Sequence, residues 1–275
     1  MAVGQYKIGA ILQARLGSTR LPNKVLMPLP LGSNSTIISQ VIDSLKKVDV
    51  ISEIVVATSK SAINDKLERY AKDRDMACFR GKEDDVLSRF YEIVKIKKFD
   101  CVIRFTADNP IIDINFLQEF INNFKNKDLD YSCTNNLPLG CNFEIMKSEQ
   151  IVLAKELANT VFDKEHVTPY IKRTASKIEF YKFENYKPID NLRLTIDYPS
   201  DYAFIQLLYA MLKNKAKTLK NIDYLVSKKA WLLEINKNNF QKKEYNNLKE
   251  EITELLPIIK ERGLSRLEKR LNIND

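Results

Sequence analysis

A loop with three cations follows the first apolar segment of the chain. Arg15, Arg20 and Lys24 fall within ten consecutive residues, directly after a β-prone run over 6–12. A glycine and a serine relax the backbone between them and Pro22 stops regular structure, so one loop can bring the three side chains together. Guanidinium groups bind phosphate oxygens by paired hydrogen bonds, and an ammonium binds them as a compact charge. The loop is therefore predicted to hold a triphosphate; the alternative is an exposed basic loop.

Two aspartates stand directly after apolar, strand-like segments further along the chain. Asp108 follows the segment over 101–105, and Asp197 follows the segment over 192–196. Magnesium prefers carboxylate oxygen and often bridges one or two carboxylates to substrate phosphates. Because ligands of open α/β sheets bind beyond the carboxyl ends of the strands, the aspartates and the cationic loop predict one shared site. Taken singly, each aspartate could instead be a turn or capping residue beside a proline.

The histidine and cysteine content narrows the chemistry. The single histidine, His166, excludes multi-histidine metal sites and most histidine-centred catalysis. The four cysteines show no CxxC spacing, so we expect neither zinc nor disulfides. Any metal must then be held by carboxylates. The cysteines are Cys78, Cys101, Cys133 and Cys141.

Charge and hydropathy limit the partners. The net charge of +8 favours anionic ligands, but no interleaved stripe of basic and aromatic residues indicates nucleic acid. A secretory signal is absent from the sequence as given, and no apolar stretch is long enough to span a membrane. We therefore expect a cytoplasmic protein that binds a small anionic molecule, without nucleic acid and without membrane insertion.

Strand-like and helical patterns alternate along the chain. Strands are predicted over 6–12, 53–58, 76–79, 101–105, 131–133, 178–183 and 192–196, and helices over 37–45, 63–71, 86–94, 114–124, 151–162 and 202–212. Such alternation predicts an α/β fold, with a mostly parallel mixed sheet flanked by helices.

The C-terminal part of the chain has a different composition. We expect one α/β domain over 1–213 and a helical extension over 214–275, which is rich in Lys and Glu. A stripe of apolar residues at helical spacing in the extension needs a cover, either from its own domain or from a dimer contact. The stripe consists of Leu248, Ile252, Leu255, Leu256 and Ile259.

Five ordered motifs resemble the cytidylyltransferase family, and together they span about residues 7–205. They are Gln13-Ala14-Arg15-x-x-Ser18-Thr19-Arg20-Leu21-Pro22-x-Lys24, Arg80-Gly81-x-x-Asp84-Asp85-Val86-Leu87-x-Arg89, Arg104-x-Thr106-Ala107-Asp108-x-Pro110, Glu165-His166-Val167-Thr168-Pro169-Tyr170 and Leu194-Thr195-Ile196-Asp197. The spore-coat-polysaccharide-type branch is the most similar, and it is related to the 3-deoxy-manno-octulosonate and acylneuraminate cytidylyltransferases. The resemblance implies a nucleotide-diphospho-sugar transferase-like (Rossmann-like) fold, CTP as donor, Mg²⁺ as cofactor and commonly a homodimer.

The same resemblance implies roles for individual residues. Catalysis is expected from Arg15, Arg20, Lys24 and Asp108, and metal binding from Asp108 and Asp197. The nucleotide is expected to contact Gln13, Ala14, Gly17, Ser18, Arg80, Asp85 and Thr106. The acceptor is expected to contact Asn142, Glu144 and His166. For Arg80 and Asp85 a solvent-facing or capping role is an equal alternative. For His166 a structural role, in which the side chain fixes a turn through hydrogen bonds, is favoured.

Asn142 departs from the family pattern. Relatives usually have an aspartate there, in Gly-x-Asp-x-Glu, whereas this chain has Gly140-Cys141-Asn142-Phe143-Glu144. The amide removes a charge and adds two donors. This difference puts the usual acceptor in doubt, although a neutral structural exchange is an alternative.

The resulting expectation is a CTP-dependent transfer of CMP to a sugar acid or related anionic metabolite, with release of pyrophosphate, for surface polysaccharide or glycoconjugate synthesis. Such a reaction depends on positioning and on neutralising phosphate charge. A glycosyltransferase of similar fold is one alternative, but it usually carries an Asp-x-Asp pair where this chain has Thr106-Ala107-Asp108. A non-catalytic nucleotide-binding homologue and a transferase for UTP or another nucleotide are the others.

Overall fold

The computed structural model describes residues 6–240 and 248–271. It divides into two compact units, 1–238 and 239–275. The boundary expected at 213/214 therefore lies further along the chain in the structure. The reason is that Leu219, Ile222 and Leu232 are fully buried in the core of the first unit. Parts of the expected extension, 241–247 and 272–275, lie outside the described residues.

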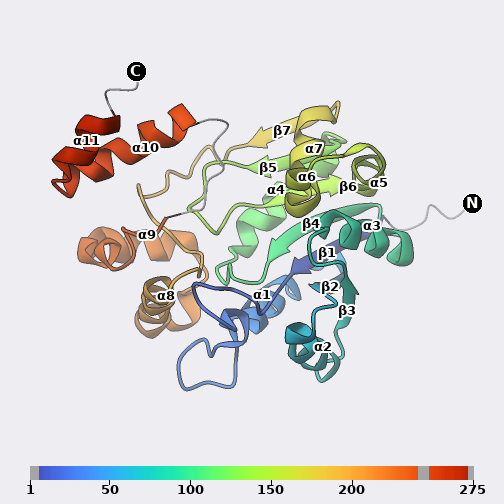
Figure 1. Ribbon diagram of the computed structural model, residues 1–275. Coiled ribbons are helices and arrows are strands. Elements are labelled where there is room, and N and C mark those ends of the chain that lie inside the picture. The colour runs from blue at the N-terminus through green and yellow to red at the C-terminus, as the bar shows by residue number, and fades with distance from the viewer. Residues whose placement is uncertain (1–5, 241–247, 272–275) are drawn as a thin grey trace, which may run out of the picture. The chain divides into compact units, whose positions relative to one another are not determined.

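The first unit is built on one seven-stranded sheet in the order β3-β2-β1-β4-β6-β5-β7 (Figure 1). The strands are β1 (Ile8–Gln13), β2 (Ile51–Ser59), β3 (Ala77–Gly81), β4 (Cys101–Thr106), β5 (Tyr131–Thr134), β6 (Glu144–Lys147) and β7 (Ile178–Tyr181). Strand β6 runs antiparallel to both of its neighbours, β4 and β5, and every other pair is parallel. The predicted mostly parallel mixed sheet is confirmed.

Helices cover both faces of this sheet (Figure 1). They are α1 (Ile37–Leu45), α2 (Asp65–Lys72), α3 (Val86–Lys97), α4 (Ile114–Asn126), α5 (Ser148–Leu157), α6 (Val161–His166), α7 (Thr168–Thr174), α8 (Pro199–Leu212) and α9 (Leu219–Lys228). Short 3₁₀ helices are η1 (Lys24–Leu26), η2 (Ala62–Asn64), η3 (Lys213–Lys215) and η4 (Ala230–Ile235).

Apolar side chains alternate between the two faces of the central strands. Along β1, Ile8, Ala10 and Leu12 belong to one buried cluster and Ile11 belongs to the other. Helices α1, α2, α4, α8 and α9 contribute to the first cluster, and α3, α5 and α7 contribute to the second. Because both faces are covered, the strands read as nearly continuous apolar runs, as is usual for parallel sheets.

The segment predicted as a last strand over 192–196 is extended but forms no strand. Its only ladder contact among the described residues is a single bridge between Leu139 and Arg193. The backbone instead bonds to two loops, since Leu194 N donates to Leu139 O and Ile196 N donates to Asp108 O. This pairing places Asp197 beside the end of β4.

The structure also differs from the prediction in the middle of the chain. Strand β6 was not predicted, because its four residues are too few to show an alternating pattern. The helix expected over 151–162 is two helices, α5 and α6, and Thr160 begins the second by accepting a hydrogen bond from Asp163 N. Helix α7 was also not predicted, whereas α9 lies in the extension over 214–275 that was predicted to be helical.

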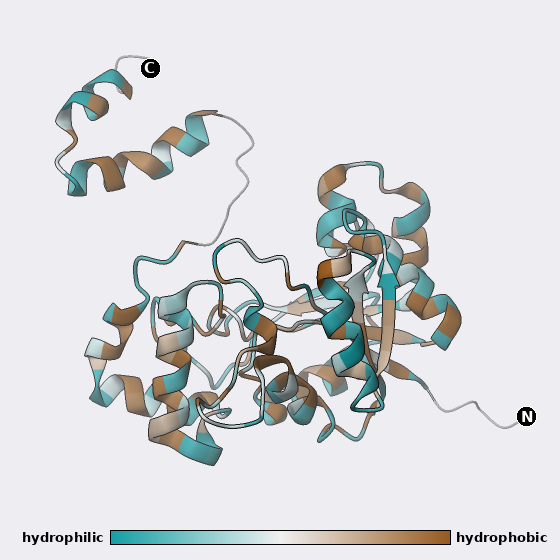
Figure 2. Ribbon diagram, turned by 60° about the horizontal axis from the view of Figure 1, so that its bottom comes forward, coloured by the Kyte–Doolittle hydropathy of each residue, from teal (hydrophilic) through white to brown (hydrophobic). Residues whose placement is uncertain are grey.

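The second unit contains α10 (Leu248–Glu261) and α11 (Ser265–Leu271). Hydrophobic and hydrophilic residues alternate along α10 (Figure 2), as the predicted stripe requires, and Ile259 is buried. Gly263 turns the chain between the two helices with a φ of +66°. In the described residues no helix combines the length and the apolar character needed to span a membrane.

Candidate active site

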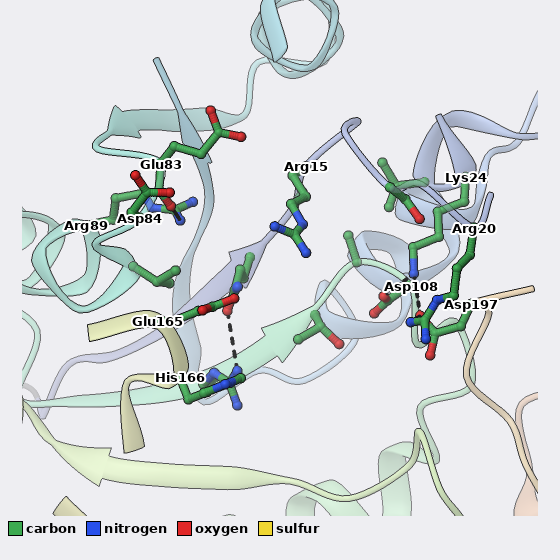
Figure 3. A pocket seen from close by; sticks show the side chains of 18 residues that line it. Arg15, Arg20, Lys24, Glu83, Asp84, Arg89, Asp108, Glu165, His166 and Asp197 are labelled. Carbon is green, nitrogen blue, oxygen red and sulfur yellow. Dashed lines mark hydrogen bonds and ion pairs between the residues drawn. The ribbon is translucent and has the colours of Figure 1, made fainter. Parts of the chain in front are cut away.

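A cleft opens at the carboxyl ends of β1 and β4. The last residues of these strands, Gln13 and Thr106, are paired in register, so the loops that follow them leave the sheet side by side. Figure 3 shows the labelled side chains of the cleft. The lining includes ten of the expected site residues, namely Gln13, Ala14, Arg15, Ser18, Arg20, Lys24, Thr106, Asp108, His166 and Asp197.

Lys24 joins the two expected metal ligands. Its ammonium lies 2.6 Å from Asp108 Oδ2 and 2.8 Å from Asp197 Oδ1, and it also donates to the carbonyl of Ile196 at 2.8 Å. The side chain is only 8% exposed. An ammonium has three donors, and here each has an acceptor. The tertiary structure thus brings the cationic loop and both aspartates to one point.

Asp197 is held by a second layer of charges. Arg20 Nη2 lies 3.0 Å from Asp197 Oδ1, and Arg193 Nη2 lies 2.9 Å from Asp197 Oδ2. The buried Asp201 accepts from Arg193 Nε at 2.9 Å and from Asp197 N at 2.9 Å. Burial alone would raise the pKa of Asp197, but Lys24, Arg20 and Arg193 lower it below its ordinary value. The carboxylate therefore stays charged and fixed in orientation.

Arg193 and Asp201 were not predicted as site residues. The sequence does contain a signal for them, because Arg193, Asp197 and Asp201 recur at intervals of four residues. The residues do not share one helix, however, since only Asp201 lies on α8. The spacing alone would have suggested a helix surface, whereas the observed frame depends on the extended segment before α8.

Arg15 lies in the cleft apart from the other two cations of its loop. Figure 3 shows it between Lys24 with its aspartates and a second group formed by Glu83, Asp84 and Arg89. Arg89 is 4% exposed and donates to the carbonyl of Glu83 at 3.2 Å. Burial, and after it the charge of Arg15, lowers the pKa of Arg89. Arg20 and Lys24 thus lie with the two aspartates, whereas Arg15 lies between them and the group around Arg89.

Arg89 also lines the cleft and was not predicted as a site residue. It closes the Arg80–Arg89 motif, so its place in the motif was the available signal. A Cβ at Gly81 would lie 2.5 Å from Arg89 Cγ, so the glycine leaves room for the aliphatic part of this buried side chain. In the described part of the chain the Nε of Arg89 has no hydrogen-bond partner.

A second pocket adjoins the cleft and shares Arg104 and Thr106 with it. Its charged centre is Glu144 on β6, which is paired in register with Arg104 on β4. Arg104 Nη1 and Lys172 Nζ each lie 2.7 Å from Glu144, and the hydroxyl of Tyr131 donates to it at 2.7 Å. Against the effect of burial, the two cations lower the pKa of Glu144 to about 2. Arg104 and Lys172 were not predicted.

Asn142 lines this second pocket, but both ends of its amide are engaged by the protein. Its Oδ1 accepts from Thr134 Oγ1 at 3.0 Å, and its Nδ2 donates to the carbonyl of Leu137 at 3.2 Å. Gly140 precedes it with a φ of +95°, and a Cβ there would lie 2.5 Å from Thr195 N. The amide at position 142 therefore has a structural function that an aspartate could not fully reproduce.

The expected nucleotide contacts Arg80, Asp85 and Gly17 are not among the residues that line the cleft. Arg80 pairs with Asp65 at 2.7 Å and with Glu68 at 2.6 Å. Its guanidinium also donates to two backbone carbonyls, and these contacts hold it away from the cleft.

Asp85 begins α3, where it accepts from Ser88 N at 2.8 Å. It also pairs with Lys155 of α5 at 2.8 Å. Burial opposes ionisation, but Lys155 and the Ser88 N–H lower the pKa of Asp85. Asp85 therefore has the helix-capping role that was the alternative to a nucleotide contact. His166 ends α6 with its ring centroid 4.6 Å from that of Phe162, and it does line the cleft.

The chemistry of the donors fits a magnesium ion at Asp108 and Asp197. Both carboxylates reach one cation, the Lys24 ammonium, within 2.8 Å. Among the described residues no group of three or more His, Cys, Asp or Glu side chains is placed to hold a metal. A two-carboxylate site is nonetheless sufficient for magnesium when substrate phosphates and water complete the coordination.

Comparison with known proteins agrees with this geometry. The family model described as cytidylyltransferase matches residues 9–237. An uncharacterized protein of Methanocaldococcus jannaschii is 32% identical over 251 residues, which cover 89% of this chain and all of that protein. The spore coat polysaccharide biosynthesis protein SpsF of Bacillus subtilis is 34% identical over 205 residues, or 72% of this chain and 85% of that protein.

A solved structure agrees as well. The cytidylyltransferase of Leptospira borgpetersenii superimposes with a TM-score of 0.75 at 26% identity, covering 86% of this chain and 99% of that chain. The family and the nucleotidyltransferase activity that the motifs predicted are confirmed. The chain belongs to the cytidylyltransferase family.

Proposed function

We propose that this protein transfers CMP from CTP to a sugar acid or related anionic metabolite and releases pyrophosphate. The observation that carries the proposal is the meeting of Lys24, Asp108 and Asp197, which come from three separate segments, in a cleft that also contains Arg15 and Arg20. We call these five residues the donor side. The acceptor side comprises Arg104, Glu144, Lys172 and Asn142 of the adjoining pocket.

On the donor side, the cations neutralise the triphosphate and the departing pyrophosphate. Two unit charges about 4 Å apart interact by roughly 4 kcal/mol at an effective dielectric constant of 20, so Arg15, Arg20 and Lys24 can supply a large share of the stabilisation. Asp108 and Asp197 would hold Mg²⁺, which when bound polarises phosphoryl oxygens as a Lewis acid. Gln13 and Thr106, at the ends of β1 and β4, position the nucleotide beside the acceptor pocket.

On the acceptor side, Arg104 and Lys172 share the single carboxylate of Glu144, so the three charges sum to one positive charge. This charge suits an acceptor with one anionic group. Arg104 lines both pockets, so an anion bound to it lies next to the nucleotide. The acceptor oxygen then attacks the α-phosphorus, and pyrophosphate leaves toward the donor-side cations.

Several finer properties belong to the same proposal. The similarity to a spore coat polysaccharide biosynthesis protein supports a role in making a surface polysaccharide or glycoconjugate. We place the protein in the cytoplasm, where CTP is available, and we propose that it forms a homodimer that covers the apolar stripe of α10. Sedimentation velocity tests the dimer.

The decisive experiment measures pyrophosphate. The full chain is incubated with Mg²⁺, each nucleoside triphosphate in turn, and a panel of sugar acids and phosphorylated metabolites. We expect release with CTP and one class of anionic acceptor, and loss of release in Asp108→Asn. The control is Asp65→Asn, which alters a carboxylate outside the cleft. Absence of release with every acceptor, together with no CTP binding by calorimetry, would contradict the proposal.

A further inference from the structure

The ammonium of Lys24 lies at the point between the two candidate metal ligands. Asp108 Oδ2 and Asp197 Oδ1 both hydrogen bond to this nitrogen, and both residues line the cleft. The ammonium donates a third hydrogen bond, to the backbone carbonyl of Ile196. The nitrogen therefore occupies a position that a divalent cation would need in order to reach both carboxylates.

The charges around this point balance without any added ion. Three positive and three negative side chains form one connected network of ion pairs: Arg20, Lys24 and Arg193 with Asp108, Asp197 and Asp201. A site that attracts a divalent cation by itself normally has excess negative charge. This network of side chains has no such excess.

Lys24 differs from Arg193, the buried cation of the network, in being able to exchange partners. Arg193 is 5% exposed, and its bonds to Asp197 and Asp201 fix it at the base of the site. Lys24 carries its charge at the end of a flexible four-carbon chain in the cationic loop. Triphosphate oxygens in the cleft would offer this ammonium acceptors of higher negative charge than the two aspartates.

We infer that Lys24 is an internal counter-ion of the metal site, which keeps divalent cations away from Asp108 and Asp197 until a triphosphate draws the ammonium to itself. The inference rests on the proposed nucleotide site. It implies that the nucleotide-free protein binds metal weakly and that metal and nucleotide occupy the site together. Lys24 therefore weakens the binding of metal and strengthens the binding of nucleotide. A residue with a purely structural function would not affect the two ligands in opposite directions.

The test measures Mn²⁺ binding to the nucleotide-free full chain from the electron paramagnetic resonance signal of free Mn²⁺. Lys24→Met removes the charge at similar length, and Lys24→Arg retains it. We expect Lys24→Met to bind Mn²⁺ at least about tenfold more tightly than the unsubstituted protein, and Lys24→Arg to remain within about threefold of it. In calorimetry with EDTA present, Lys24→Met should bind CTP at least about tenfold more weakly.

Two further variants make the outcome specific. Arg20→Met removes a cation that pairs with Asp197 and contacts the Tyr198 ring, and whose side chain is 36% exposed, so its gain in Mn²⁺ affinity should be smaller than that of Lys24→Met. The double variant Lys24→Met/Asp108→Asn should lose the gain, because a proposed ligand is missing. Thermal melting checks folding, and Lys24→Gln replaces Lys24→Met if the latter does not fold.

Equal Mn²⁺ affinity of the unsubstituted protein and the uncharged Lys24 variant would overturn the inference, as would a gain that survives in the double variant. Failure of CTP to bind the unsubstituted protein would instead contradict the proposed function. The two failures are distinguishable because the Mn²⁺ comparison uses no nucleotide.

Discussion

The donor side around Lys24 and the acceptor side around Glu144 both hold cations against carboxylates, but they are built on different elements. Donor-side charges come from the loop after β1, the loop after β4 and the extended segment before α8. Two of the acceptor-side charges, Arg104 and Glu144, are cross-strand partners in the sheet, and the third, Lys172, lies on α7. Loop-borne charges can exchange partners when a ligand arrives, whereas a pair in strand register keeps its geometry.

This difference fits the two ligands. A triphosphate brings several negative charges that need cations released from internal partners, and Arg20 and Lys24 have such partners in Asp108 and Asp197. An acceptor with one anionic group needs a small, constant positive charge. The molecule thus combines an adaptable charge cluster with a fixed one, and substitutions should affect the two differently.

The largest effect is expected from Asp108→Asn. The substitution removes a proposed metal ligand and the partner of Lys24, and we expect pyrophosphate release with CTP to fall by about 10³-fold. Unfolding in urea should change little, since this side chain is 24% exposed. A variant with more than a tenth of the original rate would show that the donor side does not depend on this carboxylate.

Glu144→Gln should affect stability and acceptor use but not CTP binding. Arg104 and Lys172 lose a largely buried carboxylate, and we expect the free energy of unfolding in urea to fall by about 3 kcal/mol. CTP affinity in calorimetry should stay within twofold. The matched control is Glu179→Gln, a more exposed carboxylate paired with Lys127, with an expected cost below about 1 kcal/mol. A tenfold loss of CTP affinity would show that the two sides are not independent.

The pH dependence of the free energy of unfolding should also depend on the carboxylate of Glu144. The pKa of Glu144 is lowered in the folded state from 4.5 to about 2, so its ionised form favours folding. The contribution is complete above pH 4.5 and is lost as pH falls from 4.5 toward 2. It amounts to about 3 kcal/mol. Urea unfolding between these pH values should be less steeply pH-dependent in Glu144→Gln, and an unchanged slope would contradict this account.

Asn142→Asp tests whether the departure from the family pattern is structural. An aspartate would set an oxygen against the carbonyl of Leu137, which now accepts from the Asn142 amide. We expect a loss of about 1–2 kcal/mol in the free energy of unfolding. Asn122→Asp, on the exposed face of α4, is the control. Unchanged stability would contradict a structural function and would favour Asn142 as a residue that binds the acceptor.

Arg80→Ala should have the smallest effect on function. Because its guanidinium is bound to Asp65 and Glu68 outside the cleft, we expect CTP affinity and pyrophosphate release to remain within about twofold. A loss above tenfold would restore the nucleotide contact that the motif implied and would extend the donor side to β3.

Local signals in the sequence were enough for much of the fold. The alternation of apolar runs predicted β1, β2, β4 and their helices because burial on both faces of a parallel sheet leaves a strong pattern. The same pattern failed for β6 and for 192–196. Four residues are too few to show a period, and an apolar segment can be buried by bonding to loops such as those at Leu139 and Asp108.

By itself, the sequence determined most of the order of elements, the cationic loop and the two aspartates, since motifs and periodicity are properties of neighbouring residues. Only the tertiary structure decided which charges meet. Lys24 pairs with Asp108 and Asp197 across 84 and 173 residues, while Arg80 of the second motif is bound elsewhere. Side-chain pairing at such separations depends on strand order and loop geometry, because these set the distances over which charges act.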